Sequence, residues 1–511
     1  MSNEKIKTLD EALSYAKKVG SEFFDKFETV LIAKNQEMKD GILRDIQNQI
    51  KQEISLFPIK TINNKEDIKN TAHIMVEETI GKLEIEQILK IPKERIEHID
   101  NKFHIAGAYY DSTTKDYERL EIHNFSLDMC KYPLHFDNCK FTNMLVEHYA
   151  NNCTGLSFVR CEFLEKIDIY ISTIKIQHTI QMKECIFHKE VKINNKIFNE
   201  NVYFNNSTFK DYVDFHESEF VKTACFYGVN FEKVPNFSQA IFNGNLNLVN
   251  TRLNFDFKEC KKITEIELKR QKKQVKNIPN SNIPTLHKVA NDFRDSFRIF
   301  KNALIKENNL LDASNYHKIE LYFKEIELKH KKPLNLSEKI DLWLLKFYRC
   351  ACSHHTNLLQ AFNSLIILIG VFAILNLVVV LSFNCFYFGF FEPNPHALFE
   401  FYNAHIKDFV VNDYILILCA NFALLLIFVG LFLCSIFCSI FRKIALAPCY
   451  FINFILLISS PKYLIPAISI FTDKRLSLDP LSINGGLYTI SFGFMIYSFV
   501  KTARRNSIVP A

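Results

Sequence analysis

The sequence predicts a multidomain protein in which a β-solenoid flanked by α-helices is followed by an α-helical transmembrane region. Two observations predict this fold class. Large apolar residues recur in alternating steps of six and five residues from Phe198 to Phe242. The stretch from Cys350 to Phe391 contains no Asp, Glu, Lys or Arg, whereas the first hundred residues are densely charged. A soluble part and a lipid-facing part therefore belong to one chain.

Composition narrows the class of partner and the compartment. Lys and Arg exceed Asp and Glu by 62 to 56, a formal charge of +6. This excess is too small and too scattered to indicate a nucleic-acid partner. The 14 cysteines include no CxxC pair, which fits a reducing compartment. The abundance of Phe, Ile, Lys and Asn is typical of an AT-rich bacterial genome.

Residues 1–100 predict an N-terminal helical region without a signal peptide. An amphipathic pattern runs to Pro58, and shorter helices are expected over 65–80 and 83–99. Two interpretations stay open. The helices form a small cap on the next domain, or they form a coiled coil or partner helix.

Residues 120–257 carry the repeat. Eleven positions keep the six-and-five rhythm and are predicted to fill the core as a ladder of side chains: Phe198, Phe204, Phe209, Phe215, Phe220, Phe226, Phe231, Phe237, Phe242, Leu248 and Leu253. Ile176, Met182, Phe187 and Ile193 extend the rhythm backwards. The pairs Phe136/Phe141 and Phe158/Phe163 are out of phase, which predicts insertions at 143–152 and 165–172.

Steps of five and six residues match neither a helix nor an ordinary strand. They indicate a coil with flat sides of about five residues, with the large residue inside. A small residue two positions earlier packs beside it, as at Cys139, Cys161, Cys185, Ser207, Ser218, Ala224, Ala240 and Thr251. Because Phe209, Phe220, Phe231 and Phe242 share one phase of an 11-residue period, we expect them to be buried in one continuous ladder.

The segment NVYFNNSTFKDYVDFHESEFVKTACFYGVNF resembles the pentapeptide-repeat family in its 11-residue variant. The resemblance implies a right-handed, four-sided β-helix of about 20–22 residues per coil, here roughly six coils. Some members of that family mimic DNA and bind topoisomerase through an acidic surface. Residues 120–257 hold 16 acidic and 13 basic residues, a balance of −3 that fits such mimicry poorly.

Residues 258–350 predict a helical connector. The basic run 258–276 is expected to be a solvated helix, with contact to anionic lipid as the alternative. Helices are expected over about 286–304 and 310–331, forming a hairpin, and a third over 337–348. The hairpin looks like the one in membrane-attached pentapeptide-repeat proteins, and it is also similar to a single tetratricopeptide unit. Trp343 and Tyr348 are expected to be interfacial anchors.

The cluster Cys350, Cys352, His354 and His355 has ligand types suited to a soft metal. Zinc sites usually draw ligand pairs from two segments, and no second pair is evident in the sequence. We therefore predict no metal site. The sequence shows no catalytic triad, phosphate-binding loop or recognisable acid pair, so neither an enzyme nor a cofactor is expected.

Residues 360–505 predict four membrane spans at about 365–388, 414–441, 444–471 and 481–500. It is open whether the third span includes 462–471. Asn376, Asn421 and Asn453 are expected to bond between helices, and Gly370 and Gly430 to allow close packing. Basic residues flank the spans on one side at Lys346, Arg349, Arg442, Lys443, Lys501, Arg504 and Arg505. This asymmetry places both termini and the solenoid in the cytoplasm of a bacterial inner membrane.

The function expected from these features is that of a membrane-anchored scaffold whose cytoplasmic solenoid binds a protein partner. The competing hypothesis is an ion channel or transporter with the solenoid as a regulatory domain. No filter sequence such as TVGYG is present, and the first, second and fourth spans contain no ionisable Asp, Glu, Lys or Arg. A topoisomerase-binding DNA mimic is the third hypothesis.

Overall fold

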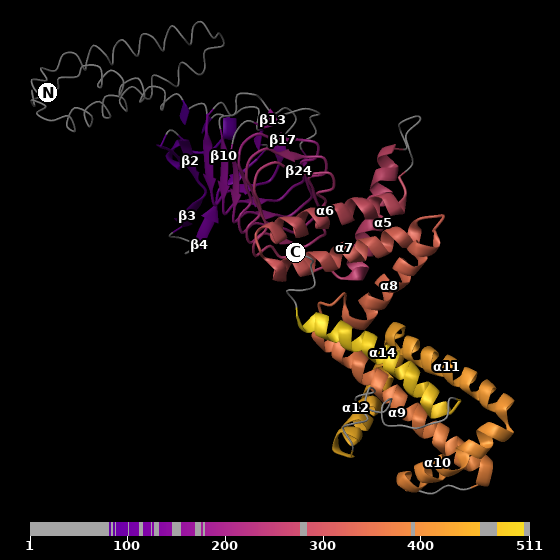
Figure 1. Cartoon of the computed structure of the whole chain (residues 1–511). Coiled ribbons are helices and arrows are strands. Elements are labelled where there is room, and N and C mark those ends of the chain that lie inside the picture. Colours follow the sequence, from indigo (N-terminus) through magenta and orange to yellow (C-terminus); the bar gives the residue numbers. More distant parts are fainter. Residues whose placement is uncertain are drawn as a thin grey trace, which may run out of the picture. The chain divides into compact units, whose positions relative to one another are not determined.

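The structure is a computed structural model of the 511-residue chain (Figure 1). It describes residues 81–82, 85–86, 88–100, 102–111, 116–123, 125–126, 132–145, 155–168, 175–176, 179–275, 284–389, 394–459 and 478–504. The helices predicted before residue 81 lie outside the described residues. The chain divides into two compact units, Met1–Asn254 and Phe255–Ala511.

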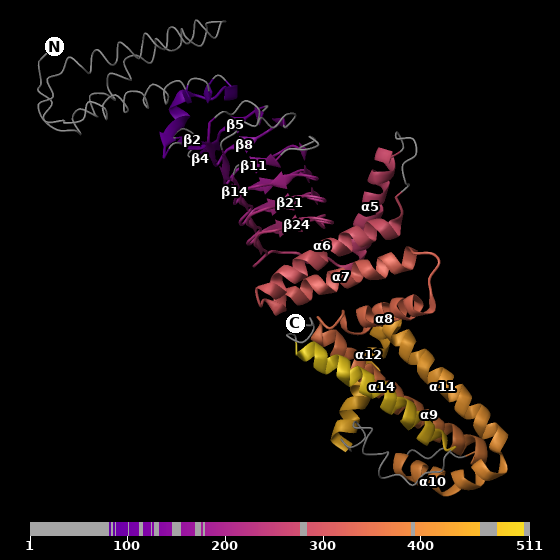
Figure 2. The same cartoon turned by 45° about the horizontal axis from the view of Figure 1, so that its top comes forward.

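The first unit is a β-solenoid in which short strands stack in parallel (Figure 2). The first stack contains β1 (Ile96–Ile99), β2 (Lys102–Ala106), β7 (Leu134–Asp137), β10 (Leu156–Val159), β14 (Ile180–Lys183), β18 (Val202–Tyr203), β22 (Ala224–Cys225) and β25 (Leu246–Asn247). The second contains β5 (Glu121–Ile122), β8 (Lys140–Phe141), β11 (Glu162–Phe163), β15 (Ile186–Phe187), β19 (Thr208–Phe209) and β23 (Asn230–Phe231).

Two further stacks complete the later coils. One contains β12 (Ile167–Asp168), β16 (Val191–Lys192) and β20 (Val213–Asp214), and the other β13 (Lys175–Ile176), β17 (Ile197–Phe198), β21 (Glu219–Phe220) and β24 (Ile241–Phe242). Two strand pairs stand apart, β3 (Ala108–Asp111) with β4 (Asp116–Arg119) and β6 (Phe125–Ser126) with β9 (Met144–Leu145).

The strand register fixes the coil length. Phe187 pairs with Phe209, and Phe198 with Phe220, so each of these coils spans two of the 11-residue periods. The insertion predicted at 143–152 is wrong, because Phe136 and Phe158 pair at the same separation. The insertion predicted near 165–172 is confirmed. Asp168 pairs with Lys192, and Lys175 pairs with Ile197. The first pair is separated by more residues than the second, so the extra residues lie between Asp168 and Lys175.

The beginning of the solenoid differs from the prediction. The helix expected over 83–99 gives way, after the 3-10 turn Lys93–Arg95, to strand β1. Pro92 interrupts the helical pattern, and β1 then pairs antiparallel with β2. Since β2 already belongs to the first stack, the solenoid starts before residue 120. Strands occupy all four stacks over about four turns, beginning with the coil that contains β10 to β13, and the earlier coils have strands in fewer stacks.

The second unit is helical. It contains α5 (Phe257–Val275), α6 (Leu286–Lys306), α7 (Leu310–His330), α8 (Leu336–Cys352), α9 (Leu358–Phe388), α10 (Pro395–Asn412), α11 (Tyr414–Phe437), α12 (Ser439–Ser459) and α14 (Pro480–Ala503). Helices α6 and α7 form the predicted hairpin. Their aromatic side chains pack together, with the rings of Phe293 and Phe323 stacked 5.2 Å apart, and Lys301 pairs with Glu320 at 2.9 Å.

Among the described residues, four helices are long and apolar enough to cross a membrane: α9, α11, α12 and α14. The second predicted span is too long, because the backbone breaks at Cys438 and α12 begins at Ser439. Arg442 therefore lies inside α12 and not between two spans. The segment between the first two predicted spans contains helix α10. Residues 460–471 lie outside the described part of the chain.

Candidate functional site

Stacked phenylalanine rings fill the solenoid. In the second stack, Phe163, Phe187, Phe209 and Phe231 follow one another at centroid distances of 4.9, 4.5 and 5.2 Å, with nearly parallel planes. In another stack, Phe198, Phe220 and Phe242 are each 4.7 Å apart. Of the eleven residues predicted for the ladder, all are buried except Phe242, which is half-buried.

The prediction that Phe209, Phe220, Phe231 and Phe242 form one continuous ladder is wrong. One coil holds two of the 11-residue periods, so a step of one period leads to the opposite side of the same coil and not to the next coil. Phe209 therefore stacks on Phe231, and Phe220 on Phe242. The 11-residue period reflects the similarity of opposite sides, and the interior holds several ladders.

The small residues beside the rings form hydrogen bonds as well as allowing close packing. Several of them donate a hydrogen bond to a carbonyl of the preceding coil, and these bonds link Ser207 to Met182 (2.7 Å), Ser218 to Ile193 (2.8 Å), Thr251 to Phe226 (2.9 Å), Cys185 to Phe158 (3.4 Å) and Cys161 to Phe136 (3.5 Å). Satisfying buried carbonyls between coils stabilises the stack. The sequence pattern predicted only a packing role for these residues.

Each of these small residues follows a left-handed corner of the coil that was not predicted from the sequence. The backbone is left-handed, with φ between 54° and 67°, at Glu184, Asn195, Asn206, Glu217, Gly228, Gln239 and Asn250. These positions recur once in every 11-residue period, and four of them are Asn or Gly, the residues that adopt this conformation at least cost. The recurrence of Asn and Gly was the available signal.

Charged side chains on the outside of the solenoid pair between neighbouring coils. Lys222 contacts Glu200 at 2.6 Å and Lys233 contacts Asp211 at 2.6 Å, and the partners of each pair lie one coil apart. Arg160 binds Asp137 through two nitrogens, at 2.6 and 3.0 Å. These pairs are exposed and add little stability each. They leave an outer face whose residues can change without disturbing the ladders inside.

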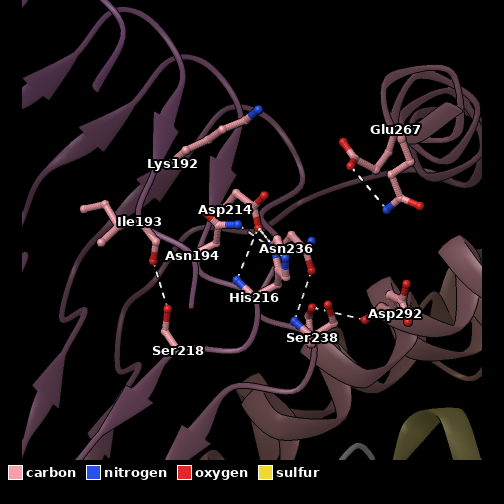
Figure 3. A network of polar contacts seen from close by, with 12 residues as sticks. Lys192, Ile193, Asn194, Asp214, His216, Ser218, Asn236, Ser238, Glu267 and Asp292 are labelled. Carbon is pink, nitrogen blue, oxygen red and sulfur yellow. Dashed lines mark hydrogen bonds and ion pairs between the residues drawn. The ribbon is translucent and has the colours of Figure 1, made fainter. Parts of the chain in front are cut away.

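A polar network marks another corner of successive coils (Figure 3). The carboxylate of Asp214 accepts from the amide of His216 at 3.2 Å and lies 2.7 Å from its Nδ1 atom. One coil later, Asn236 accepts from the amide of Ser238 at 3.0 Å. Both are side-chain turns of the kind that Asp and Asn form two residues ahead. The Asp–His pair therefore has a structural explanation.

The connector is joined to the spanning helices by a polar junction around α8. The guanidinium of Arg349 binds both oxygens of Glu325 on α7, at 2.7 and 3.0 Å, in a bidentate pair. Glu325 is buried. The hydroxyl groups of Tyr322 and Ser353 lie 3.3 Å apart. These contacts orient the hairpin α6–α7 on the helix that precedes the first span.

Three consecutive left-handed residues form the turn between α8 and α9. Ser353, His354 and His355 have φ values of 52°, 51° and 66°. Such a run is costly for residues other than Gly and persists only where surrounding contacts hold it. The ring of His355 provides such contacts, because its Nδ1 atom lies 3.3 Å from the carbonyl of Ser498 and 3.4 Å from the hydroxyl of Thr502. The turn thus ties the start of α9 to the end of α14.

The junction histidines are buried and neutral. Burial lowers the pKa of His354 to about 3 and that of His355 to about 4. The Nε2 atom of His354 has no hydrogen-bond partner within the described residues. Burial also raises the pKa of the Cys352 thiol to about 11, although its sulfur lies 3.5 Å from Nδ1 of His355. In the described part of the chain, no three His, Cys, Asp or Glu side chains are grouped to hold a metal ion.

Asparagine side chains link the spanning helices. Asn453 donates to the carbonyl of Ile366 at 3.1 Å and Asn421 to that of Leu478 at 2.8 Å, and Asn376 accepts from Asn484 at 2.6 Å. The inter-helix bonds predicted for Asn376 and Asn453 are confirmed, whereas Asn421 bonds to a residue in the turn that precedes α14, and Asn484 was missed. Gly370 permits close packing, because a Cβ atom there would lie 2.5 Å from Cys449. The same prediction for Gly430 is wrong, since nothing lies within 4 Å of its Cβ position.

Comparison with known proteins gives no relative: no family model, no curated protein and no solved structure matches the chain.

Proposed function

We propose that the protein is a membrane-anchored scaffold whose solenoid presents a rigid surface to a protein partner. The supporting observation is that the aromatic and the charged side chains occupy separate positions in each coil. The rings stack inside, and the charged residues pair on the outside between coils. A repeat of this kind offers a long surface whose composition is independent of its core. The spanning helices would hold that surface at a membrane.

We assign the solenoid to the pentapeptide-repeat type, as a right-handed quadrilateral β-helix. Three features support this assignment: the coil length of two 11-residue periods, the four stacks of short parallel strands, and the left-handed corner in each period. The quoted repeat segment and the rings inside the coil agree with the same type.

The proposed location is a bacterial inner membrane with both termini and the solenoid in the cytoplasm. Contacts gather the basic residues at one end of the spanning helices: Arg442 reaches the carbonyl of Cys350, and the ammonium of Lys346 lies 5.1 Å from the ring of Phe437. At the other end, Tyr402 of α10 donates to the buried carboxylate of Asp479. Such an asymmetry favours the basic end in the cytoplasm.

An ion channel or transporter is the second candidate, and one observation favours it. The side-chain oxygens of Asn384, Asn421, Asn453 and Asn484 are buried without a hydrogen-bond partner among the described residues. Unsatisfied carbonyl oxygens in an apolar bundle are where a hydrated path would lie.

Ion flux distinguishes the two candidates. The full-length protein would be reconstituted into vesicles loaded with a fluorescent ion indicator, with protein-free vesicles as the control. The scaffold proposal expects no flux above the control. Ion-selective flux that is abolished by Asn484→Leu, in a variant whose Tm in detergent is unchanged, would support the channel and contradict the proposal.

A further inference from the structure

Helix α8 carries an apolar stripe that the described part of the chain leaves exposed. Leu336, Ile340 and Trp343 follow one another at helical spacing and are 74%, 52% and 47% exposed. The next residue of the same stripe, Phe347, is only 3% exposed. The stripe is therefore covered at its C-terminal end, at Phe347, and is exposed over the two preceding turns among the residues that the structure describes.

The contact of Phe347 shows which way the stripe faces. Its ring lies 6.5 Å from that of Phe437, the last residue of α11, and 5.9 Å from that of Phe494 in α14. The indole of Trp343 stacks on Phe347 at 5.5 Å. Helix α8 lies between the hairpin and the ends of the spanning helices (Figure 2). The face that touches the spans at Phe347 thus continues beyond them, where the medium beside a spanning helix is lipid.

The opposite face of α8 belongs to the protein. Arg349 forms its bidentate pair with Glu325 of the hairpin on that side. The acidic residues of α8, Glu338 and Asp341, also lie off the stripe, and Glu338 is engaged with Lys331 and in capping the helix at Asn335. The apolar stripe therefore carries no acidic side chain.

Basic side chains border the stripe. Lys339 and Lys346 each follow a stripe residue by three positions, Leu336 and Trp343, so both lie along one edge of it. Lys339 is exposed, and the ammonium of Lys346 lies over the ring of Phe437 at 5.1 Å. A long lysine side chain at this level can extend to a phosphate while its methylene groups stay on apolar surface.

We infer that α8 is an interfacial helix that lies in the membrane surface and binds anionic phospholipid headgroups through Lys339 and Lys346. The inference rests on the proposed membrane anchoring and adds the lipid class and the residues that contact it. An apolar stripe with a lysine edge and no acidic residue on that side is the pattern of helices in the boundary between headgroups and acyl chains.

The chain provides its own probe, because Trp343 is its single tryptophan. The full-length protein would be reconstituted into vesicles of phosphatidylcholine and phosphatidylglycerol whose acyl chains carry bromine at defined depths. We expect bromine near the headgroup to quench the fluorescence more strongly than bromine near the chain end, and acrylamide in the water to quench it weakly. Strong acrylamide quenching without bromine quenching would overturn the inference.

Two variants separate surface binding from mere proximity to the spans. The double substitution Leu336→Ser and Ile340→Ser should decrease bromine quenching at Trp343. Leu311→Ser should leave it unchanged, because Leu311 is 48% exposed on α7, outside the stripe. Unchanged quenching in the double variant would contradict the inference.

The anionic preference has its own test. Quenching should fall in vesicles of phosphatidylcholine alone, and this dependence should disappear with Lys339→Gln and Lys346→Gln together. Equal quenching of the unmodified protein in both vesicle types would contradict it. If the protein floats with the vesicles while Trp343 stays unquenched, the inference fails and the anchoring stands. If the protein does not enter vesicles at all, the anchoring itself fails.

Discussion

The guanidinium of Arg442 donates a hydrogen bond of 2.8 Å to the main-chain carbonyl of Cys350, across 92 residues of sequence. It also donates to the carbonyl of Gln360 and to the hydroxyl of Ser364. One side chain near the start of α12 thus satisfies acceptors at the end of α8 and the start of α9. The basic residue that the sequence marks as an orientation signal is also a structural clamp at the junction.

Replacing Arg442 should destabilise this junction. We expect Arg442→Leu to lower the Tm of the full-length protein in detergent, because three acceptors lose a charged donor, each bond being worth roughly 1.5–3 kcal/mol. Arg442→Lys should restore only part of the loss, since an ammonium cannot reach all three acceptors. Lys443→Leu removes the same charge one residue later and serves as the control. An equal loss in Arg442→Leu and Lys443→Leu would show that charge, and not the clamp, matters.

Within the solenoid, Phe220→Ala should cost far more stability than Phe242→Ala. Phe220 is 1% exposed between two rings, so its removal leaves a cavity worth about 3–5 kcal/mol. Phe242 is half-buried. The readout is the denaturant concentration at which the buried thiol of Cys225 becomes accessible to a labelling reagent. Equal shifts in the two variants would contradict the assignment of Phe220 to the middle of a ladder.

At the corner formed by Gly228, substitution by Asn should cost less stability than substitution by Val. Its φ is +67°, and a Cβ atom there would meet the amide oxygen of Asn206 at 2.2 Å. Asn already occupies the equivalent left-handed corners at 195, 206 and 250, and the atom that a Cβ would meet is the end of the Asn206 side chain and not backbone. We expect Gly228→Val to cost about 2 kcal/mol or more and Gly228→Asn clearly less, measured by the same thiol labelling. Similar losses of stability in the two variants would mean that the clash with Asn206, and not the backbone conformation, determines the cost.

Acidification should destabilise the junction. The pKa values of His354 and His355 in the folded protein, about 3 and about 4, lie below the 6.5 of an unfolded histidine. Between these values the unfolded chain binds protons that the folded chain does not, so stability falls as pH drops from about 6.5 toward 4. The double variant His354→Gln and His355→Gln should show a smaller fall in Tm over this range than the unmodified protein. The control substitution His123→Gln changes an exposed histidine of the solenoid. The fall in Tm of this variant should equal that of the unmodified protein.

Sequence patterns predicted the solenoid and the four apolar helices because each of these features depends on many residues that share the same property. A phenylalanine at every fifth or sixth position requires an apolar interior to pack in, and the helix that contains residues 365–383 is long and apolar enough to cross a membrane. The 11-residue period, however, describes half a coil. Only the pairing of Phe209 with Phe231 reveals that the ladders repeat after two such periods.

Features that depend on few residues were missed or misplaced. The break at Cys438 has no Pro or Gly to mark it, and α12 begins at the next residue. The left-handed turn at Ser353–His355 consists of residues that rarely adopt that backbone, and contacts with the distant helix α14 hold it. Neither the hydrogen bonds of Ser207 and Ser218 nor the reach of Arg442 follows from local sequence.

The most direct test of the scaffold account is site-specific photocrosslinking of the full-length protein in its native membrane. A photoreactive amino acid would replace Lys210 or Glu232, exposed residues that follow Phe209 and Phe231 in adjacent coils, with Leu311 on α7 as the control position. The account predicts that a discrete protein adduct forms from the two solenoid positions and not from the control. Adducts from Leu311 alone, with none from any outward position of the solenoid, would contradict it.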